Sequence, residues 1–136
     1  MLQQVNCFMD FYIGAYGKTI RICTSSKESL MDIQNIFTRL KDGVVNEFSF
    51  RSSENVQITV MDDLIIRPSQ HNKYTAHTIQ KSKQTWKGLV FIWTLTQDNI
   101  EDCEGLIEGL IENGESGHQY LTKESDGVLV EIAFKG

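Results

Sequence analysis

The strongest constraint on the fold is an internal repeat, because the two halves of the chain share one pattern of apolar residues. Residues 20–24 align with residues 90–94, and both segments are rich in the β-branched residues that strands favour. The apolar positions that follow keep the same spacing, with Leu30, Ile33, Ile36, Phe37 and Leu40 aligned to Ile100, Cys103, Leu106, Ile107 and Leu110. After a short slip the match resumes, with Phe48, Val56, Ile58 and Val60 aligned to Tyr120, Val128, Val130 and Ile132. Self-similarity at a fixed spacing is the signature of a duplicated structural unit.

Each half is expected to form two strands, a helix and two further strands. In the first half we predict strands over residues 5–13 and 19–24, a helix over 26–41, and a closing hairpin of 48–51 with 56–61. In the second half we predict strands over 74–80 and 86–96, a helix over 98–113, and a closing hairpin of 118–122 with 128–134. The apolar residues 64–66 are expected to add a strand or a buried crossing between the halves.

The ends of the first helix carry recognisable signals. Ser25 and Glu28 have the spacing of a capping box, in which two side chains satisfy free backbone N–H groups at the helix start. Gly43 suits the position just beyond the helix end, where glycine is favoured. The helical spacing also predicts which residues are buried against the sheet: Ile36, Leu40, Leu106 and Leu110.

These elements predict an α+β fold. Antiparallel strands with one helix in each unit predict two tandem ββαββ repeats, with an antiparallel sheet and the helices packed on one face. We expect the repeats, residues 5–61 and 74–134, to be related by a pseudo-twofold axis inside one domain of residues 1–136. A chain of this length is typical of one domain.

The charges of the chain are unevenly distributed. The formal net charge is −5, and residues 98–115 contain seven acids and no Lys or Arg. Residues 64–97 contain no acid but include the basic residues Arg67, Lys73, Lys81, Lys83 and Lys87. The acidic total argues against nucleic acid as the main partner, because phosphate contacts need Lys and Arg. It is compatible with a basic protein partner.

The sharpest candidate site is the predicted second helix and the segment that follows it. Its acids recur at helical spacing opposite the apolar positions, and no Lys alternates with them. The alternative is a solvated helix face in an acidic protein. We predict that partner binding uses these residues: Glu101, Glu104, Glu108, Glu112, Glu115, His118 and Tyr120.

No catalytic signature occurs in the chain. A lone imidazole such as that of His118 can act as a general acid or base, but it needs a nucleophile or a paired acid nearby. Glu115, Tyr120 and Asp126 show no recognisable spacing to it. The chain lacks the motifs GxGxxG, GxxxxGK[ST], GxSxG, HExxH and CxxC. His71 and His77 are poorly spaced for a metal ion. We therefore expect no enzyme activity, no catalytic residue, no metal and no cofactor.

The cysteines and the chain start indicate a reducing compartment. Cys7, Cys23 and Cys103 are odd in number and too far apart for a metal knuckle, so we expect three free thiols, with Cys23 and Cys103 buried. The first residues lack the basic start and apolar run of a signal peptide. No stretch is long enough to span a bilayer. We expect a soluble, cytoplasmic protein.

The part of the chain from residue 86 to residue 134 resembles a known class of protein. A strand with a central Trp93 leads into the acidic helix, then Gly117-His118-Gln119-Tyr120-Leu121, then the strand Val128-Leu129-Val130-Glu131-Ile132. This pattern is similar to small acidic immunity-type proteins of bacterial polymorphic and contact-dependent toxin systems. The resemblance implies a cytosolic protein that binds a toxin domain, often a nuclease, and holds it inactive.

The expected function is therefore stoichiometric binding of a basic protein, most simply as an immunity protein that neutralises a toxin. The first alternative is a nucleic-acid-binding protein that uses a sheet face, with the basic middle segment, Tyr74 and Trp86. The second alternative is a small enzyme that uses His118. The position of Lys73, Lys81, Lys83 and Lys87 relative to Tyr74 and Trp86 distinguishes nucleic-acid binding from protein binding.

Overall fold

The structure, a computed structural model, describes residues 7–69, 78–81, 89–123 and 127–135, and within 78–81 it describes the side chain of Ile79 alone. Two α-helices lie in this part of the chain, α1 (Lys27–Lys41) and α2 (Gln97–Asn113), with a short 3-10 helix, η1 (Phe50–Ser52). The strands are β1 (Cys7–Gly14), β2 (Gly17–Thr24), β3 (Phe48–Ser49), β4 (Val56–Ile58), β5 (Asp63–Pro68), β6 (Thr78–Lys81), β7 (Val90–Leu95), β8 (Gly117–Tyr120) and β9 (Leu129–Phe134).

The strands form two mixed sheets, so the α+β class is confirmed and the antiparallel sheet is wrong. Sheet A has the order β4-β1-β2-β9-β8, and sheet B has the order β3-β5-β7-β6. In sheet A the pairs β1–β2 and β8–β9 are antiparallel, whereas β1–β4 and β2–β9 are parallel. In sheet B the pairs β3–β5 and β6–β7 are antiparallel, whereas β5–β7 is parallel. Each sheet therefore joins strands from both halves of the chain through a central parallel pair.

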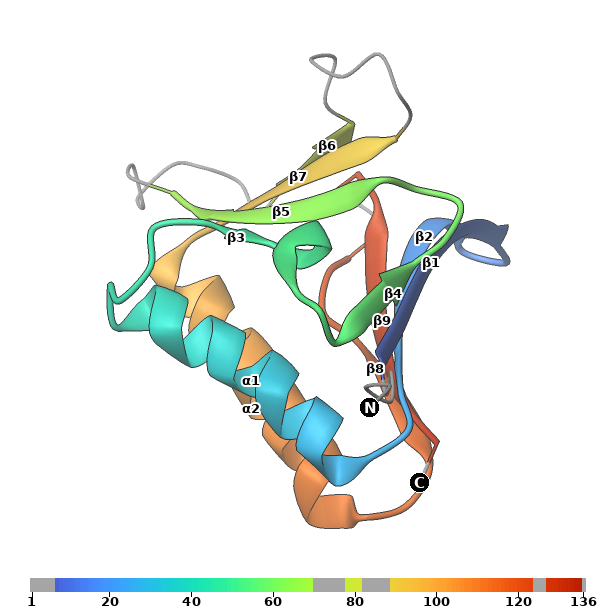
Figure 1. Cartoon of the computed structure of the whole chain (residues 1–136), viewed down its shortest axis with the longest axis vertical. Helices are drawn as coiled ribbons and strands as arrows, with labels where there is room; N and C mark the ends of the chain where they lie inside the picture. Colours follow the sequence, from blue (N-terminus) through green and yellow to red (C-terminus); the bar gives the residue numbers. More distant parts are fainter. Residues whose placement is uncertain (1–6, 70–77, 82–88, 124–126, 136) are drawn as a thin grey trace.

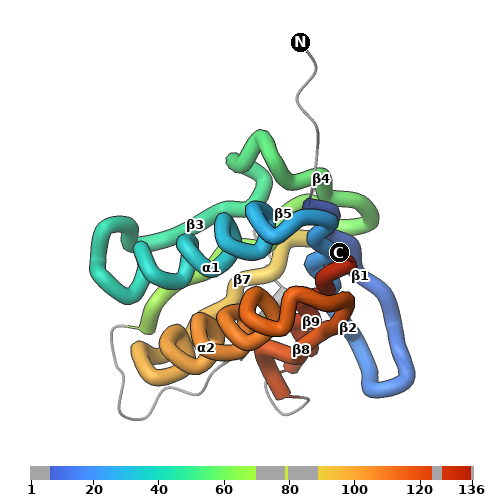
Figure 2. The backbone as a smooth tube through the Cα atoms, turned by 90° about the horizontal axis from the view of Figure 1, so that it is seen from below, coloured from blue at the N-terminus to red at the C-terminus, as the bar shows by residue number. Residues whose placement is uncertain are grey.

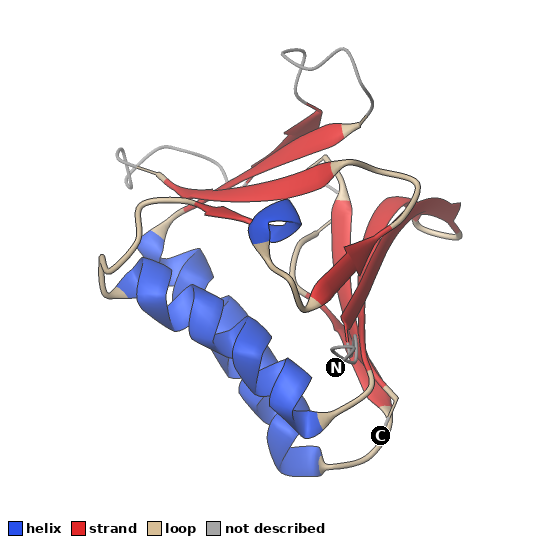
Figure 3. Ribbon diagram, viewed as in Figure 1, coloured by secondary structure: helices blue, strands red, loops and turns tan. Residues whose placement is uncertain are grey.

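The two sheets and the helix pair enclose one core. Figure 1 shows the sheets meeting at an angle, with α1 and α2 across the open side of the wedge. The same arrangement is visible by element type in Figure 3, where η1 lies within the wedge. Phe11 of sheet A stacks on Phe91 of sheet B with ring centroids 5.0 Å apart. Phe37 of α1 meets Trp93 of sheet B edge-on at 5.6 Å.

The two helices lie side by side and run in opposite directions (Figure 2). The polar contacts between them agree, since the start of α2 at Gln97 meets the end of α1 at Lys41. α1 begins after Ser26, whose hydroxyl accepts from the backbone N–H of Ser29, so the predicted capping residue Ser25 is one position early. At the other end, Gly43 has φ 74°, as predicted for the residue beyond the helix.

The predicted core residues are buried with one exception. Ile36, Leu40 and Leu110 are buried in the core. Leu106 is only partly buried, because it lies at the margin of the apolar side of α2 and packs against the core from its edge. The three cysteines are free thiols as predicted, but Cys23 is half-buried rather than buried.

The predicted hairpin of residues 48–51 with 56–61 is wrong. β3 joins sheet B and β4 joins the far edge of sheet A, so the two strands do not pair. The cause is local, since Phe50 turns its fully buried side chain into the core. The carboxylate of Asp63 holds this turn by accepting from the hydroxyl of Ser49 and from the backbone N–H of Arg51 at 2.9 Å. The structure therefore does not confirm the two tandem ββαββ repeats, which stay a prediction.

Candidate functional site

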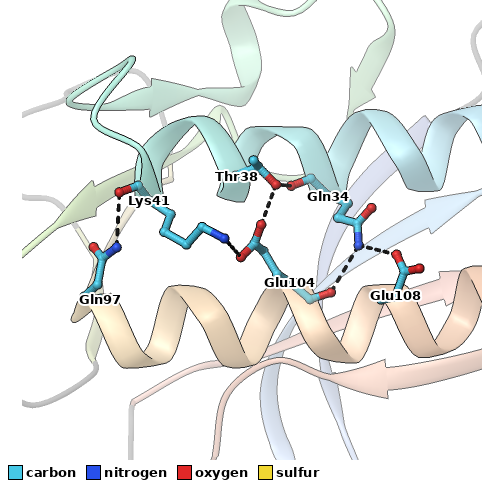
Figure 4. Close-up of polar contacts among 6 residues, drawn as sticks. All are labelled: Gln34, Thr38, Lys41, Gln97, Glu104 and Glu108. Atoms are coloured by element: carbon cyan, nitrogen blue, oxygen red, sulfur yellow. Dashed lines mark hydrogen bonds and ion pairs between the residues drawn. The ribbon is translucent and has the colours of Figure 1, made fainter.

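Two of the predicted partner-binding acids bridge the helix pair. Figure 4 shows Glu104 of α2 between Thr38 and Lys41 of α1. The Thr38 hydroxyl donates to its carboxylate, and the Lys41 ammonium lies 2.7 Å away. Gln34 donates to the Glu108 carboxylate at 2.6 Å and to the Glu104 carbonyl at 3.3 Å. Glu104 and Glu108 therefore tie α2 to α1.

The environment of Glu104 favours its charged form. Burial raises the pKa of this carboxyl, but hydrogen bonds from Lys41 and Thr38 together with the Lys41 charge outweigh burial, so the pKa lies below its usual value. The same contact raises the pKa of Lys41. Because the two ionised groups stabilise each other, Glu104 acts first as a structural residue.

The remaining acids form an exposed surface, which we call the acidic face: Asp98, Glu101, Asp102, Glu112 and Glu115. Lys41 reaches only the start of this surface, where it lies within electrostatic range of Glu101. No basic residue lies in the last turn of α2. Glu112 and Glu115 therefore stand at the negative end of the helix dipole, where acids are unfavourable.

His118 and Tyr120 lie on a different surface from the acidic face. Val130, Ile132 and Phe134 of β9 belong to the core, and side chains of a strand alternate between its faces. Glu131 and Ala133 therefore face away from the helices, and they pair with Tyr120 and His118 of β8. We call this side of sheet A the outer face. The structure thus separates the predicted site residues into three groups.

Glu131 is the centre of a polar cluster on the outer face. It is only 8% exposed, although it lies on the side of the sheet away from the core. Nδ1 of His118 lies 2.9 Å from one carboxylate oxygen, and the Tyr12 hydroxyl donates to the other at 3.3 Å. Burial and then the Glu131 charge raise the pKa values of Tyr12 and Tyr120. The Tyr120 ring also meets the imidazole, with centroids 5.8 Å apart.

This cluster supplies the paired acid that the sequence did not reveal beside His118. A carboxylate on one ring nitrogen can fix the orientation of an imidazole. Among the described residues, His118 contacts the carboxylate of Glu131 and the ring of Tyr120. The signal that could have found Glu131 is its position as a lone acid in the apolar strand β9.

A second polar contact and a hollow lie beside this cluster. Arg21 pairs with Asp10 at 2.9 Å, and its guanidinium lies over the Tyr12 ring at 4.9 Å from the centroid. Next to them is a hollow of about 320 Å³. It is lined by Phe8, Met9, Asp10, Arg21, Cys23, Thr24, Ser25, Thr59 and Lys135.

Several candidate residues lie outside the described part of the chain. These are His71, Lys73, Tyr74, His77, Lys83, Trp86 and Lys87, together with the side chain of Lys81. The nucleic-acid alternative that depends on them stays a prediction. The described residues contain no group of three or more His, Cys, Asp or Glu placed to hold a metal ion.

Comparison of the chain with protein-family models, with curated proteins and with solved structures finds no match in any of the three. Neither helix in the described residues is long and apolar enough to cross a membrane.

Proposed function

We propose that this protein is a stoichiometric protein-binding module of the immunity type, which neutralises a basic partner such as a toxin nuclease in the cytoplasm. The acidic face is proposed to be the surface that meets this partner. His118 and Tyr120 are proposed to contact the partner where it extends past Glu115 onto the edge strand β8. On this proposal the protein is not an enzyme.

One observation carries the proposal, namely that acids remain at the end of α2 where the fold disfavours them. Glu112 and Glu115 oppose the helix dipole, and the last turn of α2 has no base to offset them. Glu104, in contrast, has partners within the chain. Exposed charge that destabilises its own helix is better explained by a partner of opposite charge, which it would attract over about 10 Å at 0.1 M salt.

Two glycines on α2 support the same surface. Gly105 and Gly109 are exposed, and a Cβ at either position would meet no atom within 4 Å. Glycine inside a helix costs about 0.8–1.0 kcal/mol relative to alanine, and no packing within the described chain requires it here. Both lie on the turns between Asp102 and Glu112, so they leave the middle of the acidic face flat.

The internal duplication is also proposed, as the origin of this architecture. Sheet A contains β1-β2-β9-β8 and sheet B contains β6-β7-β5-β3, and in both the pairings run antiparallel, parallel, antiparallel. The sequence repeat aligns Gln34 with Glu104 and Thr38 with Glu108. The contacts Gln34–Glu108 and Thr38–Glu104 exchange under that alignment, as a twofold axis requires. An experimental structure in which residues 17–41 and 90–113 are unrelated by rotation would overturn this part.

The function is tested by isolating the partner and measuring the complex. Tagged protein is purified from the source cell at low salt, and each co-purifying protein is produced separately. We expect one basic protein that forms a 1:1 complex, measured by light scattering after size-exclusion chromatography, and that loses its own activity in the complex. Purified protein that binds no protein partner but binds RNA or DNA at physiological salt would contradict the proposal.

Alanine at the two glycines gives a test in which stability and binding change in opposite directions. Gly105→Ala with Gly109→Ala should stabilise the free protein by about 1–2 kcal/mol. The same pair of methyl groups should weaken the complex, because they raise the surface that the partner approaches. A more stable variant that binds with unchanged affinity would remove the middle of α2 from the interface.

A further inference from the structure

The outer face of sheet A contains a hollow of about 320 Å³ near one end of a row of paired residues. Phe8, Cys23, Ala133 and His118 form one cross-strand row, because Phe8 pairs with Cys23, Cys23 with Ala133, and Ala133 with His118. The two central residues are small and the two outer ones are large. The neighbouring row contains Asp10, Arg21, Glu131 and Tyr120. Phe8, Cys23 and Arg21 are among the residues that line the hollow.

The hollow carries unbalanced positive charge in a chain of net charge −5. Two cations line it, Arg21 and Lys135, with one acid, Asp10. Asp10 is already engaged, because both of its carboxylate oxygens accept from the Arg21 guanidinium, at 3.3 and 2.9 Å. Lys135 is exposed and forms no ion pair with any described residue. Its ammonium is therefore available to an anionic group of a ligand.

One of the residues that line the hollow is aromatic, namely Phe8. Phe8 is 46% exposed, which is high for so large an apolar side chain. An aromatic ring placed against it would remove apolar surface from water and stack or meet it edge-on. A volume near 300 Å³ is at the small end of ligand sites, which usually combine apolar walls with a few polar groups.

We propose that this hollow is a binding site for a small aromatic carboxylate, with the ring against Phe8 and the carboxylate on Lys135. The proposal stands apart from the proposed function, because the residues that line the hollow include neither the acidic face nor His118 and Tyr120. One ring with a short acid side chain fits the volume.

Cys23 lines the hollow, so the rate at which its thiol is alkylated reports whether the hollow is occupied. Burial raises the pKa values of the Cys7 and Cys103 thiols to about 12, so these two react slowly near neutral pH. Alkylation of half-buried Cys23 by the neutral reagent N-ethylmaleimide is followed by mass spectrometry at rising concentrations of phenylacetate. Phenylacetamide tests the ring without the charge, and acetate tests the charge without the ring.

We expect phenylacetate to protect Cys23 saturably, with a Kd of about 1 mM or tighter. Phenylacetamide and acetate should protect at least several-fold less well. Lys135→Gln should raise the Kd for phenylacetate roughly two- to fivefold, the effect of one exposed charge pair. Phe8→Ser should also weaken protection. The control Lys27→Gln changes an exposed lysine at the start of α1 and should have no effect.

Three outcomes would overturn the proposal. The first is that phenylacetate does not protect Cys23 from alkylation at a concentration of about ten times the expected Kd. The second is equal protection by phenylacetamide, which would make the charge irrelevant. The third is full protection in both Lys135→Gln and Phe8→Ser, which would place the ligand elsewhere. Each leaves the association of the acidic face with a protein partner unaffected, so the two proposals fail independently.

Discussion

At the scale of single residues, the three cysteines differ in their surroundings and should differ in reactivity. Burial raises the pKa values of Cys7 and Cys103 to about 12, whereas Cys23 lies half-buried on the outer face. At pH 8 only about 1 in 10,000 thiols of pKa 12 is ionised, and the thiolate is the reactive form. We expect one fast thiol in the folded protein and three after unfolding, measured by alkylation and mass spectrometry. Fast reaction at Cys7 or Cys103 in the folded protein would contradict the packing.

Val60 is a second residue whose conformation leads to a prediction. It has φ 73° and is 72% exposed, in the loop between β4 and β5. A β-branched residue in this left-handed region carries strain of roughly 1–2 kcal/mol, which glycine avoids. Val60→Gly should therefore leave the free energy of unfolding unchanged or raise it by up to about 1 kcal/mol, measured in urea.

The matched control for Val60 is Val44, which is 66% exposed but lacks a positive φ. Val44→Gly should lower the free energy of unfolding by about 0.4–1 kcal/mol, because it only adds freedom to the unfolded chain. Equal losses at the two positions would show that Val60 is unstrained.

At the scale of elements, the helix pair should respond to pH through Glu104. The folded-state pKa of Glu104 lies below its ordinary value of 4.5, so its contribution is present above that pH and is lost as the pH falls through the folded value. Glu104→Gln should lower the free energy of unfolding by about 1–3 kcal/mol at pH 7. This difference in free energy between the variant and the wild type should become smaller below pH 4. Urea unfolding at both pH values measures this.

Glu112→Gln is the control for this pH test. It also removes one carboxylate from α2, but it should change stability at pH 7 by only a few tenths of a kcal/mol, in the stabilising direction. If Glu104→Gln behaves like this control, the contacts of Glu104 with Thr38 and Lys41 do not stabilise the helix pair.

The packing of α2 gives a prediction for two leucines. Leu110 is buried, so Leu110→Ala should cost about 2–5 kcal/mol through lost burial and the cavity it leaves. Leu106 is only partly buried, and its replacement by Ala should cost clearly less. Urea unfolding of both variants gives the comparison. A loss at Leu106 as large as that at Leu110 would show that the helix is rotated.

At the scale of the whole molecule, periodicity predicted the elements better than their partners. The helix bounds were predicted to within one residue, and the hairpin pairs β1–β2 and β8–β9 were predicted with strand bounds that differ by up to two residues. Alternation along a strand shows which residues are buried but not which strand lies beside it. The mixed sheets depend on long-range parallel pairs, such as β2 with β9, that leave no local signal.

The same limit applies to the candidate site. The acids of α2 were correctly placed on a helix, but helical spacing cannot show that α1 lies against Glu104 and Glu108. Likewise, Glu131 meets His118 only through the register of β8 on β9. A sequence pattern identifies one face of an element, and the neighbouring element determines what that face contacts.

The most direct test of protein binding through the acidic face is the salt dependence of association with the isolated partner. The variant carries Asp102→Asn, Glu112→Gln and Glu115→Gln, which leave Glu104 and Glu108 in place. The control carries Glu28→Gln, Asp32→Asn and Glu54→Gln, which change the net charge equally at exposed positions outside the acidic face. Rate constants are measured by stopped flow across ionic strength.

We expect the acidic-face variant to associate several-fold more slowly than the control at an ionic strength of about 0.01 M, where charges act over about 30 Å. The difference should disappear near 1 M, where the range is about 3 Å. Equal rates for the two variants at every ionic strength would contradict binding through the acidic face.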